Sequence, residues 1–326
     1  MRIFIGLAEV ANNAFTYAKA FQSLGHETYT VIVERNSFYL DSTYDTVLNG
    51  ERVAPEKLLS RSEMLTRRIK VFIRALRNCD TFLFLFGTSF LPRHWDYPIL
   101  KLFGKHIVSI FLGDDVRYWY AYEQEMRLLG WEADLKPYLE YRKSDVTDLF
   151  VTKLKREGLP FEFQLVEKMP NTEVRELLAK ADIVVDQLFS QTVAGFALES
   201  LATGNVVLAK YNSEYSHIPS DCPVVNVTVD TLPTELRRFV LNGDLRRQLA
   251  YAGREYVERY HSHVKVARQI LDWLKPGGIQ AYDFVPTFFQ KDFMMPPELL
   301  KEERRRIRRQ RMKWFSDLFS RSVKRV

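Results

Sequence analysis

The sequence predicts an α/β protein of two parts, each built on a parallel β-sheet, and three observations lead to this prediction. Strand patterns at 2–7 and 27–33 flank a helical pattern, and strand, helix and strand within about 33 residues form a βαβ unit. The same alternation resumes from Asp145. A chain of 326 residues, 46% hydrophobic and 27% charged, has the length of about two domains and enough apolar material for a core.

In the first half, the helix after residue 11 has Phe15, Ala18 and Phe21 on one face, and Asn12 or Asn13 is its expected cap. Gly25 stands where a glycine usually ends a helix. Further along this half, we expect helices at 55–78 and 98–103 and strands at 81–86 and 106–112.

The stretch 117–141 is aromatic and charged, and we expect it to form one or two helices that bridge the halves. In the second half, we expect helices at 146–157, 172–181, 195–203, 234–242 and 245–261, and strands at 161–166, 182–186, 205–209 and 224–227.

The net charge of +6 is concentrated at one end of the chain. Residues 301–326 hold 11 Lys/Arg and 3 Asp/Glu, which leaves 47 − 11 = 36 basic and 41 − 3 = 38 acidic side chains elsewhere. Nucleic-acid binding by the folded body is therefore not indicated. The tail mixes these arginines with apolar side chains, which suits either a helix on an anionic membrane surface or one packed on the N-terminal domain.

Cysteine content and hydropathy limit the class of protein further. Only Cys79 and Cys222 occur, without metal-type spacing, so we expect a reducing compartment and no metal site. No apolar run reaches the roughly 18 residues that a membrane span needs, and the chain opens on a strand pattern rather than a signal peptide. We therefore expect a cytoplasmic protein, peripheral to a membrane only if its tail binds there.

Three predicted strand ends carry residues suited to ligand binding, because parallel sheets bind ligands at their carboxyl edge. The first holds Gly6. The second holds Asp115, which equally suits a local turn with an exposed ion pair. The third runs from Asp186, at a strand end, to Glu199 on the next helix.

The third strand end combines an anion site with a carboxylate. The amides around Ala194 and Gly195 open a helix and suit a diphosphate, and the Glu199 carboxylate can accept both ribose hydroxyls. Plainer interpretations are that Glu199 is a solvated helix residue and that Asp186 only starts a turn.

The block 195–207, GFALESLATGNVV, resembles the nucleotide-binding segment of GT-B-fold retaining glycosyltransferases, the group 1 or family-4-like enzymes. The later GREYVERYHS at 253–262 is similar to their closing helix. The resemblance implies a GT-B-like α/β fold, with two Rossmann-like domains facing a cleft and here a basic C-terminal helix. The implied regions are an acceptor-side domain at 1–135, a nucleotide-sugar domain at 136–271, a return segment at 272–300 and the tail at 301–326.

The resemblance also implies residue roles. Glu199 would bind the donor ribose, and Gly195 with its neighbouring amides the diphosphate. Arg142 and Lys143, unless they form an ordinary solvated turn, would neutralise the leaving group, while Gln191 and Asp115 would contact sugars. Family members commonly have an acidic residue where Gln191 stands.

The implied activity is retaining transfer of a sugar, of the hexosyl type, from a nucleotide-diphosphate sugar to a glycan, lipid-linked or cell-surface acceptor. The donor is a substrate, and no cofactor or metal is expected. The main alternative is a GT-B-fold protein that has lost turnover and acts as a binding or scaffold module. Another Rossmann-like enzyme is disfavoured because the first strand lacks G-x-G-x-x-G, and a nucleic-acid-binding function would depend on the tail alone.

Overall fold

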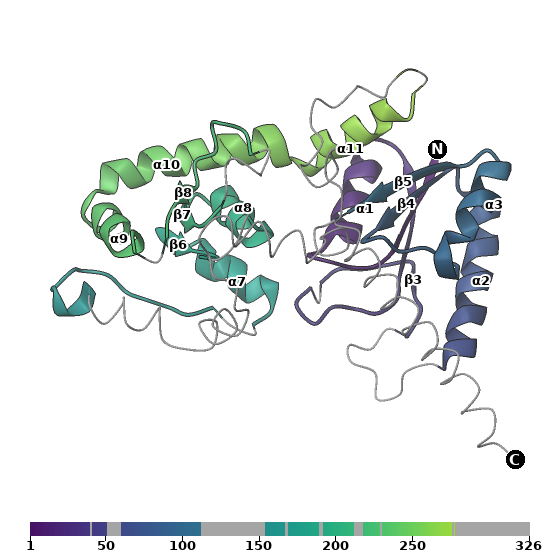
Figure 1. Cartoon of the computed structure of the whole chain (residues 1–326), viewed down its shortest axis with the longest axis horizontal. Coiled ribbons are helices and arrows are strands. Elements are labelled where there is room, and N and C mark those ends of the chain that lie inside the picture. Colours follow the sequence, from purple (N-terminus) through teal and green to yellow (C-terminus); the bar gives the residue numbers. More distant parts are fainter. Residues whose placement is uncertain are drawn as a thin grey trace, which may run out of the picture. The chain divides into compact units, whose positions relative to one another are not determined.

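The computed structural model contains two parallel sheets within one compact unit, Met1–Ala281. It describes residues 1–39, 41–50, 60–111, 154–166, 169–188, 192–211, 218–228, 230–275 and 277. Within these ranges the strand orders are β3-β2-β1-β4-β5 and β6-β7-β8 (Figure 1). The predicted α/β class with parallel sheets is thus confirmed. The predicted domain boundaries stay a prediction, and the predicted bridge 117–141 and tail 301–326 lie outside the described residues.

The first sheet is centred on β1, which pairs in parallel with both β2 and β4. Its strands are β1 (Arg2–Leu7), β2 (Glu27–Ile32), β3 (Thr46–Val47), β4 (Thr81–Leu85) and β5 (His106–Ile110). The side chains of β1 and β4 are buried almost throughout. This continuous burial is expected of central parallel strands, which are covered on both faces.

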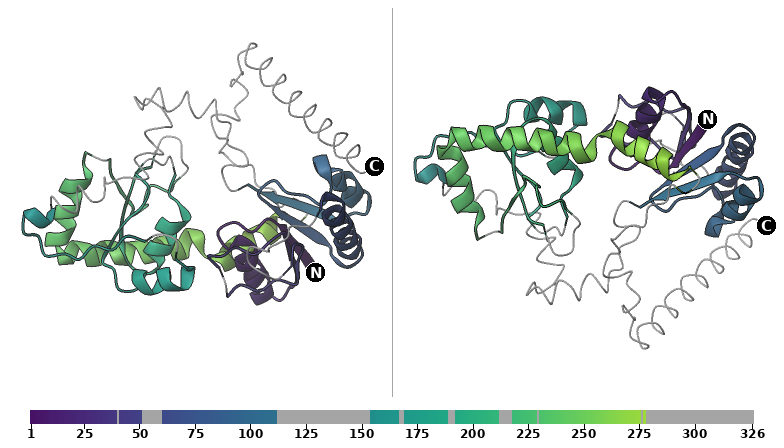
Figure 2. Two further views of the ribbon diagram at one scale, coloured as in Figure 1. Left: turned by 90° about the horizontal axis from the view of Figure 1, so that it is seen from below. Right: turned by 90° about the horizontal axis from the view of Figure 1, so that it is seen from above.

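Helices cover both faces of the first sheet (Figure 2). On one face, α2 (Arg61–Asn78) and α3 (Asp96–Leu102), which follows a short 3₁₀ turn (Pro92–His94), pack against aromatic strand residues such as Phe4 and Phe82. On the other face, α1 (Asn13–Ser23) and α11 (His263–Trp273) cover Ile3, Ile5 and Leu83.

The start of α2 is fixed by a capping box rather than by the apolar pattern. The hydroxyl of Ser60 accepts from the backbone N–H of Glu63, and the Glu63 carboxylate accepts from the backbone N–H of Ser60. The helix therefore begins at Arg61, and the predicted start at residue 55 is wrong.

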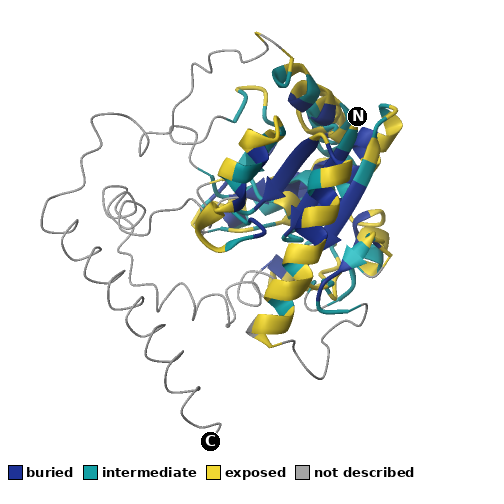
Figure 3. Cartoon of the chain, turned by 90° about the vertical axis from the view of Figure 1, so that its right-hand side faces the viewer, coloured by how far each residue is buried: buried dark blue, intermediate teal, exposed yellow. Residues whose placement is uncertain are grey.

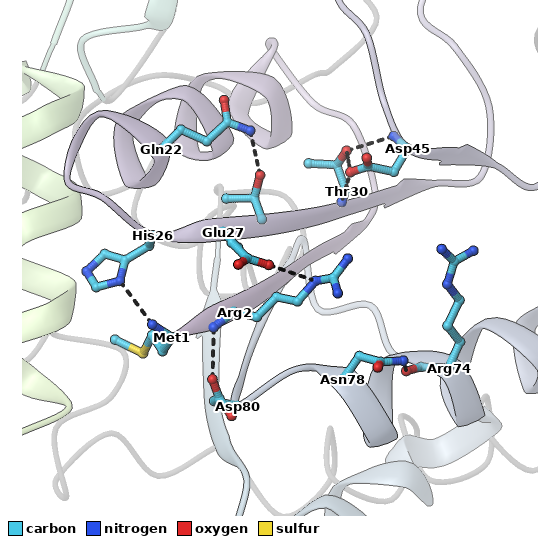
Figure 4. A network of polar contacts seen from close by, with 11 residues as sticks. Met1, Arg2, Gln22, His26, Glu27, Thr30, Asp45, Arg74, Asn78 and Asp80 are labelled. Carbon is cyan, nitrogen blue, oxygen red and sulfur yellow. Dashed lines mark hydrogen bonds and ion pairs between the residues drawn. The ribbon is translucent and has the colours of Figure 1, made fainter.

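A network of polar contacts joins the amino ends of the strands in the first sheet (Figure 4). The backbone N–H of Arg2 donates to Asp80 Oδ2 at 2.8 Å, and the backbone N–H of Asp80 donates to the Arg2 carbonyl at 2.9 Å. The Arg2 and Glu27 side chains lie 3.8 Å apart. The backbone bonds fix the register of β1 against β4, whereas an exposed ion pair of this kind adds little stability.

The chain returns to the first sheet through α11. Ala267 and Ile270 of this helix are buried in the same apolar cluster as Phe21 of α1. The predicted return segment, 272–300, lies mostly outside the described residues and stays a prediction.

The second sheet is smaller and is also covered by helices. Its strands are β6 (Ile183–Val185), β7 (Val206–Ala209) and β8 (Val225–Asn226). Its helices are α7 (Asn171–Leu178), α8 (Gly195–Ala202), α9 (Leu232–Leu241) and α10 (Gly243–Tyr256), with a π-helical turn at Val257–His261. Val207 packs in one cluster with α8, and Leu208 packs in another with α9, so the two faces of β7 are buried separately.

One predicted strand is absent. Residues 161–166 alternate apolar and polar side chains, yet they form no strand, and Phe163 and Leu165 are exposed. Alternation stabilises a strand only when one face packs on a core and the backbone pairs with a neighbour. No strand in the described ranges pairs with this segment.

Substituting Gly6 with alanine tests how tightly β1 is packed. An added Cβ would lie 2.1 Å from the Val31 carbonyl oxygen, and both atoms belong to the rigid sheet backbone. We expect Gly6→Ala to lower the free energy of unfolding by about 1–3 kcal/mol or more, measured by urea denaturation. Gly195→Ala is the matched control, because its Cβ would meet no described atom within 4 Å. Equal stability of the two variants would contradict this account.

Candidate functional site

Asp186 follows β6 directly and lies at the carboxyl edge of the second sheet. Its backbone N–H donates to the Leu208 carbonyl at 2.9 Å, which extends the pairing with β7. Its carboxylate faces the backbone N–H groups of Gln187 and Ala197. The Oδ2 atom is buried and has no hydrogen-bond partner among the described residues. Burial raises the pKa of this carboxyl, against the effect of the two N–H groups.

The first turn of α8 lies beside Asp186. The capping position is Ala194, whose side chain has no oxygen to accept from the helix N–H groups. Gly195 is the first helical residue, and the space where a Cβ would stand holds no described atom within 4 Å. Asp186 faces the N–H of Ala197, one residue further into the turn than Phe196. The earlier N–H groups therefore suit an anion from outside the helix.

Glu199 lies one turn further along α8 and is half-buried. Its Oε2 accepts from Asn171 Nδ2 at 3.2 Å, and Asn171 is the first residue of α7. Burial raises the pKa of Glu199, while the hydrogen bond from Asn171 and the charge of Arg175 act in the opposite direction. Glu199 is thus held by a neighbouring helix and is not the freely solvated residue of the plainer interpretation.

The loop after β2 reaches the same carboxylate. The backbone N–H of Asn171 donates to the Phe38 carbonyl at 2.8 Å. Burial raises the pKa of the adjacent Tyr39, and the negative charges of Glu199 and Glu9 raise it further. Asn171, Arg175 and Tyr39 were not among the site residues predicted from the sequence. A helix start after Pro170 could have indicated Asn171, but the approach of Phe38 and Tyr39 depends on tertiary packing.

The N-terminus of α1 is occupied by a carboxylate of the chain itself. Glu9 accepts from the Tyr44 hydroxyl at 2.6 Å and from the Ala14 N–H at 3.4 Å, and burial raises its pKa. Asn12 stands at the capping position as predicted, although its side chain makes no hydrogen bond to the first turn of the helix. Asn12 has a left-handed backbone, and its Oδ1 accepts from Ser42 Oγ at 2.7 Å.

The other predicted site residues fall into two groups. Gly6 lies inside β1, between Val31 and Phe84 of the neighbouring strands, where the sheet packing itself requires a glycine. The remaining predicted residues lie outside the described ranges, and their roles stay predictions: Asp115, Arg142, Lys143 and Gln191.

Two kinds of feature are absent from the described ranges: a metal-binding cluster and a membrane-spanning helix. There, no cluster of three or more His, Cys, Asp or Glu side chains could hold a metal ion. No helix in the same ranges is both long and apolar enough to cross a bilayer. Cys79 and Cys222 are free thiols, and burial raises the pKa of each, to about 11 for Cys79.

The raised pKa of Glu199 predicts a pH-dependent stability. Below its ordinary pKa of 4.5, Glu199 is protonated in the folded and in the unfolded chain, and its contribution to the free energy of unfolding is fully present. This contribution is lost as pH rises through the pKa of Glu199 in the folded chain. We therefore expect Glu199→Gln to gain stability relative to the native chain as pH rises above 4.5 and through the folded-state pKa. Urea denaturation at several pH values measures this difference, and Glu176→Gln on α7 controls for loss of one charge. A difference between Glu199→Gln and the native chain that is constant over pH would refute the expectation.

The match to a protein family covers the second half of the chain. Residues 144–272 match the model of a family described as glycosyl transferase-like. No curated protein matches the chain. The matched segment includes Asp186, Gly195 and Glu199, and it supports glycosyl transfer as the general class of activity.

Two solved structures are similar to the chain over most of its length. Sucrose-phosphate synthase from Thermosynechococcus elongatus is 11% identical, with a TM-score of 0.45 over 82% of this chain and 96% of that one. The glycosyltransferase SnogD from Streptomyces nogalater is 13% identical, with a TM-score of 0.40 over 83% of this chain and 98% of that one. Both TM-scores lie below 0.5, and we draw no functional conclusion from either.

Proposed function

We propose that the chain transfers a sugar, of the hexosyl type, from a nucleotide-diphosphate sugar to a glycan, lipid-linked or cell-surface acceptor. The observation that carries the proposal is the first turn of α8. There the capping residue Ala194 has no side chain to bond the helix N–H groups, and no described atom stands where a Gly195 Cβ would lie, one turn from the Glu199 carboxylate that Asn171 holds. The glycosyl transferase-like match over residues 144–272 supports it.

The spacing along α8 suits the two polar parts of a nucleotide. Gly195 and Glu199 are four residues apart, a rise of about 6 Å along a helix. A diphosphate at the N–H groups of Gly195 would therefore leave its ribose one turn away, beside Glu199. The Glu199 carboxylate would accept the ribose hydroxyls, and Asn171 would keep it oriented.

Catalysis in this proposal depends mainly on stabilising the leaving group. The bond between the anomeric carbon and the diphosphate oxygen breaks, the acceptor oxygen bonds to that carbon, and the acceptor hydroxyl passes its proton to the leaving diphosphate oxygen. Negative charge then gathers on the nucleoside diphosphate, where the α8 terminus stabilises it. Arg142 and Lys143 would add positive charge, and Gln191 and Asp115 would contact the sugars. The GT-B-like arrangement and retention of configuration belong to the proposal.

Binding without turnover is the second candidate function. Gln191 stands where the resembled family commonly has an acidic residue beside the donor sugar. A glutamine cannot act as a base, and its neutral amide has no negative charge to stabilise positive charge on the sugar. A binding or scaffold module would keep the donor site and release no free nucleotide. Turnover assays on a chain that binds nucleotide separate the two.

Thermal unfolding with UDP, GDP, ADP and their sugar conjugates tests the donor site. A nucleotide at 100 times its dissociation constant should stabilise the native chain by about 2.7 kcal/mol. We expect Glu199→Ala to lose most of this stabilisation, because the ribose hydroxyls lose their acceptor. Glu176→Ala, which removes an exposed carboxylate from α7, should respond like the native chain. If no nucleotide stabilises the native chain, the proposed donor site is wrong.

Because the pKa of the buried Asp186 carboxyl is raised, we expect the affinity for the donor to fall as pH rises. A diphosphate at the α8 terminus would raise the already elevated pKa of this buried carboxyl, since like charges disfavour ionisation. Binding therefore favours protonated Asp186, and affinity decreases as pH rises through its pKa. Calorimetric titration with a nucleotide sugar at several pH values measures this. Asp186→Asn should lose this fall in affinity; an unchanged fall would place the titrating group elsewhere.

A further inference from the structure

The outward side of α2 exposes a row of aliphatic side chains. Leu65, Ile69 and Ile73 are spaced by four residues and so lie on one side of the helix. They are 41%, 39% and 43% exposed, and Figure 3 shows exposed residues along the outer side of this helix. Val71 and Ala75 on the opposite side are buried against the sheet. The row is therefore additional to the face that α2 needs for the core.

A row of cations runs beside the aliphatic row. Lys70 directly follows Ile69, Arg74 directly follows Ile73, and Arg77 lies about one turn beyond; all three are exposed. The guanidinium of Arg74 lies 5.1 Å from the ring centre of Tyr29, whereas Lys70 and Arg77 extend the row on either side. Over Arg61–Asn78 there are six basic residues and one acidic residue, a balance of +5.

A second exposed apolar group occurs where α3 ends. Leu102 is 84% exposed and Phe103 is 60% exposed, and Lys101 precedes them. Both α2 and α3 pack on the same face of the first sheet. Each helix ends shortly before a strand, and those strands pair at Thr81 and His106, so both helix ends lie at the amino edge of the sheet.

We propose that this surface, the aliphatic row of Leu65, Ile69 and Ile73 flanked by Lys70 and Arg77, binds an anionic lipid membrane. Aliphatic side chains beside lysine and arginine suit the boundary between acyl chains and headgroups, where the long cationic side chains extend toward the phosphates. Anionic lipids complement the balance of +5 on α2.

Two other occupants fit the surface less well. The chain's own segment 301–326 carries a balance of +8 and would be repelled by the cations of α2. Protein interfaces draw most of their affinity from Trp, Tyr and Arg, with leucine under-represented, whereas this row is wholly aliphatic. A lipid surface is therefore the occupant that both the charge and the side-chain types favour.

Co-sedimentation of the full chain with vesicles tests the proposal. The vesicles contain phosphatidylcholine alone or phosphatidylcholine with phosphatidylglycerol. We expect the native chain to bind the anionic vesicles, and Leu65→Ser/Ile69→Ser/Ile73→Ser to bind them about tenfold more weakly. Lys70→Gln/Arg77→Gln should bind the anionic vesicles several-fold more weakly than the native chain does. Leu241→Ser, at the exposed end of α9, is the matched control and should bind like the native chain.

The segment 301–326 is kept in every variant, so its own contribution is common to all of them. Circular dichroism and thermal unfolding establish that each variant is folded. Equal binding by the folded triple serine variant and the native chain would overturn the proposal, because the membrane contact would then lie elsewhere. Absence of binding by the native chain would also overturn it, and the surface would then fit an acidic protein instead.

Discussion

The need to satisfy the N–H groups at helix starts governs both halves of this protein. In each half a parallel strand leads into a helix whose first turn has no partners inside the helix. The chain meets this need for α1 with the buried Glu9 carboxylate, which also accepts from Tyr44. For α8 it supplies Asp186, which faces Ala197 but leaves the earlier N–H groups beside the open space at Gly195. The same architecture thus gives one filled anion site and one partly open site.

Gly6 and Gly195 differ in how far the surrounding chain requires a glycine. At Gly6 the neighbouring Val31 carbonyl excludes any side chain, so the residue is explained by packing within the sheet. Nothing in the described chain crowds Gly195, so packing alone does not require a glycine there. In the proposed function, the absence of a side chain at Gly195 would let a diphosphate approach the backbone at the helix start.

The sequence was sufficient for the regular part of the fold. Apolar strands such as β4 and helices such as α8 were predicted to within a few residues, because burial on both faces and helical periodicity are local signals. One failure has a local cause that the apolar pattern does not carry, and the other has a non-local cause. The start of α2 depends on the capping box at Ser60, and 161–166 lacks the partner that a strand needs. At the site, the positions of Asp186 at a strand end and of Glu199 on the next helix were predicted from the pattern along the chain, whereas the pairing of Glu199 with Asn171 was not.

Asn171 shows how the second half could make its carboxylate specific for a ligand. A half-buried Glu199 is costly to ionise, and its pKa is raised despite the hydrogen bond from Asn171. Asn171 is itself fixed, because its backbone N–H donates to the Phe38 carbonyl. A carboxylate held by one donor keeps lone pairs for others, and its incomplete solvation makes each further hydroxyl more favourable than it would be in water. In the proposed function, the same incomplete solvation that raises the pKa of Glu199 would therefore favour the paired hydroxyls of a ribose.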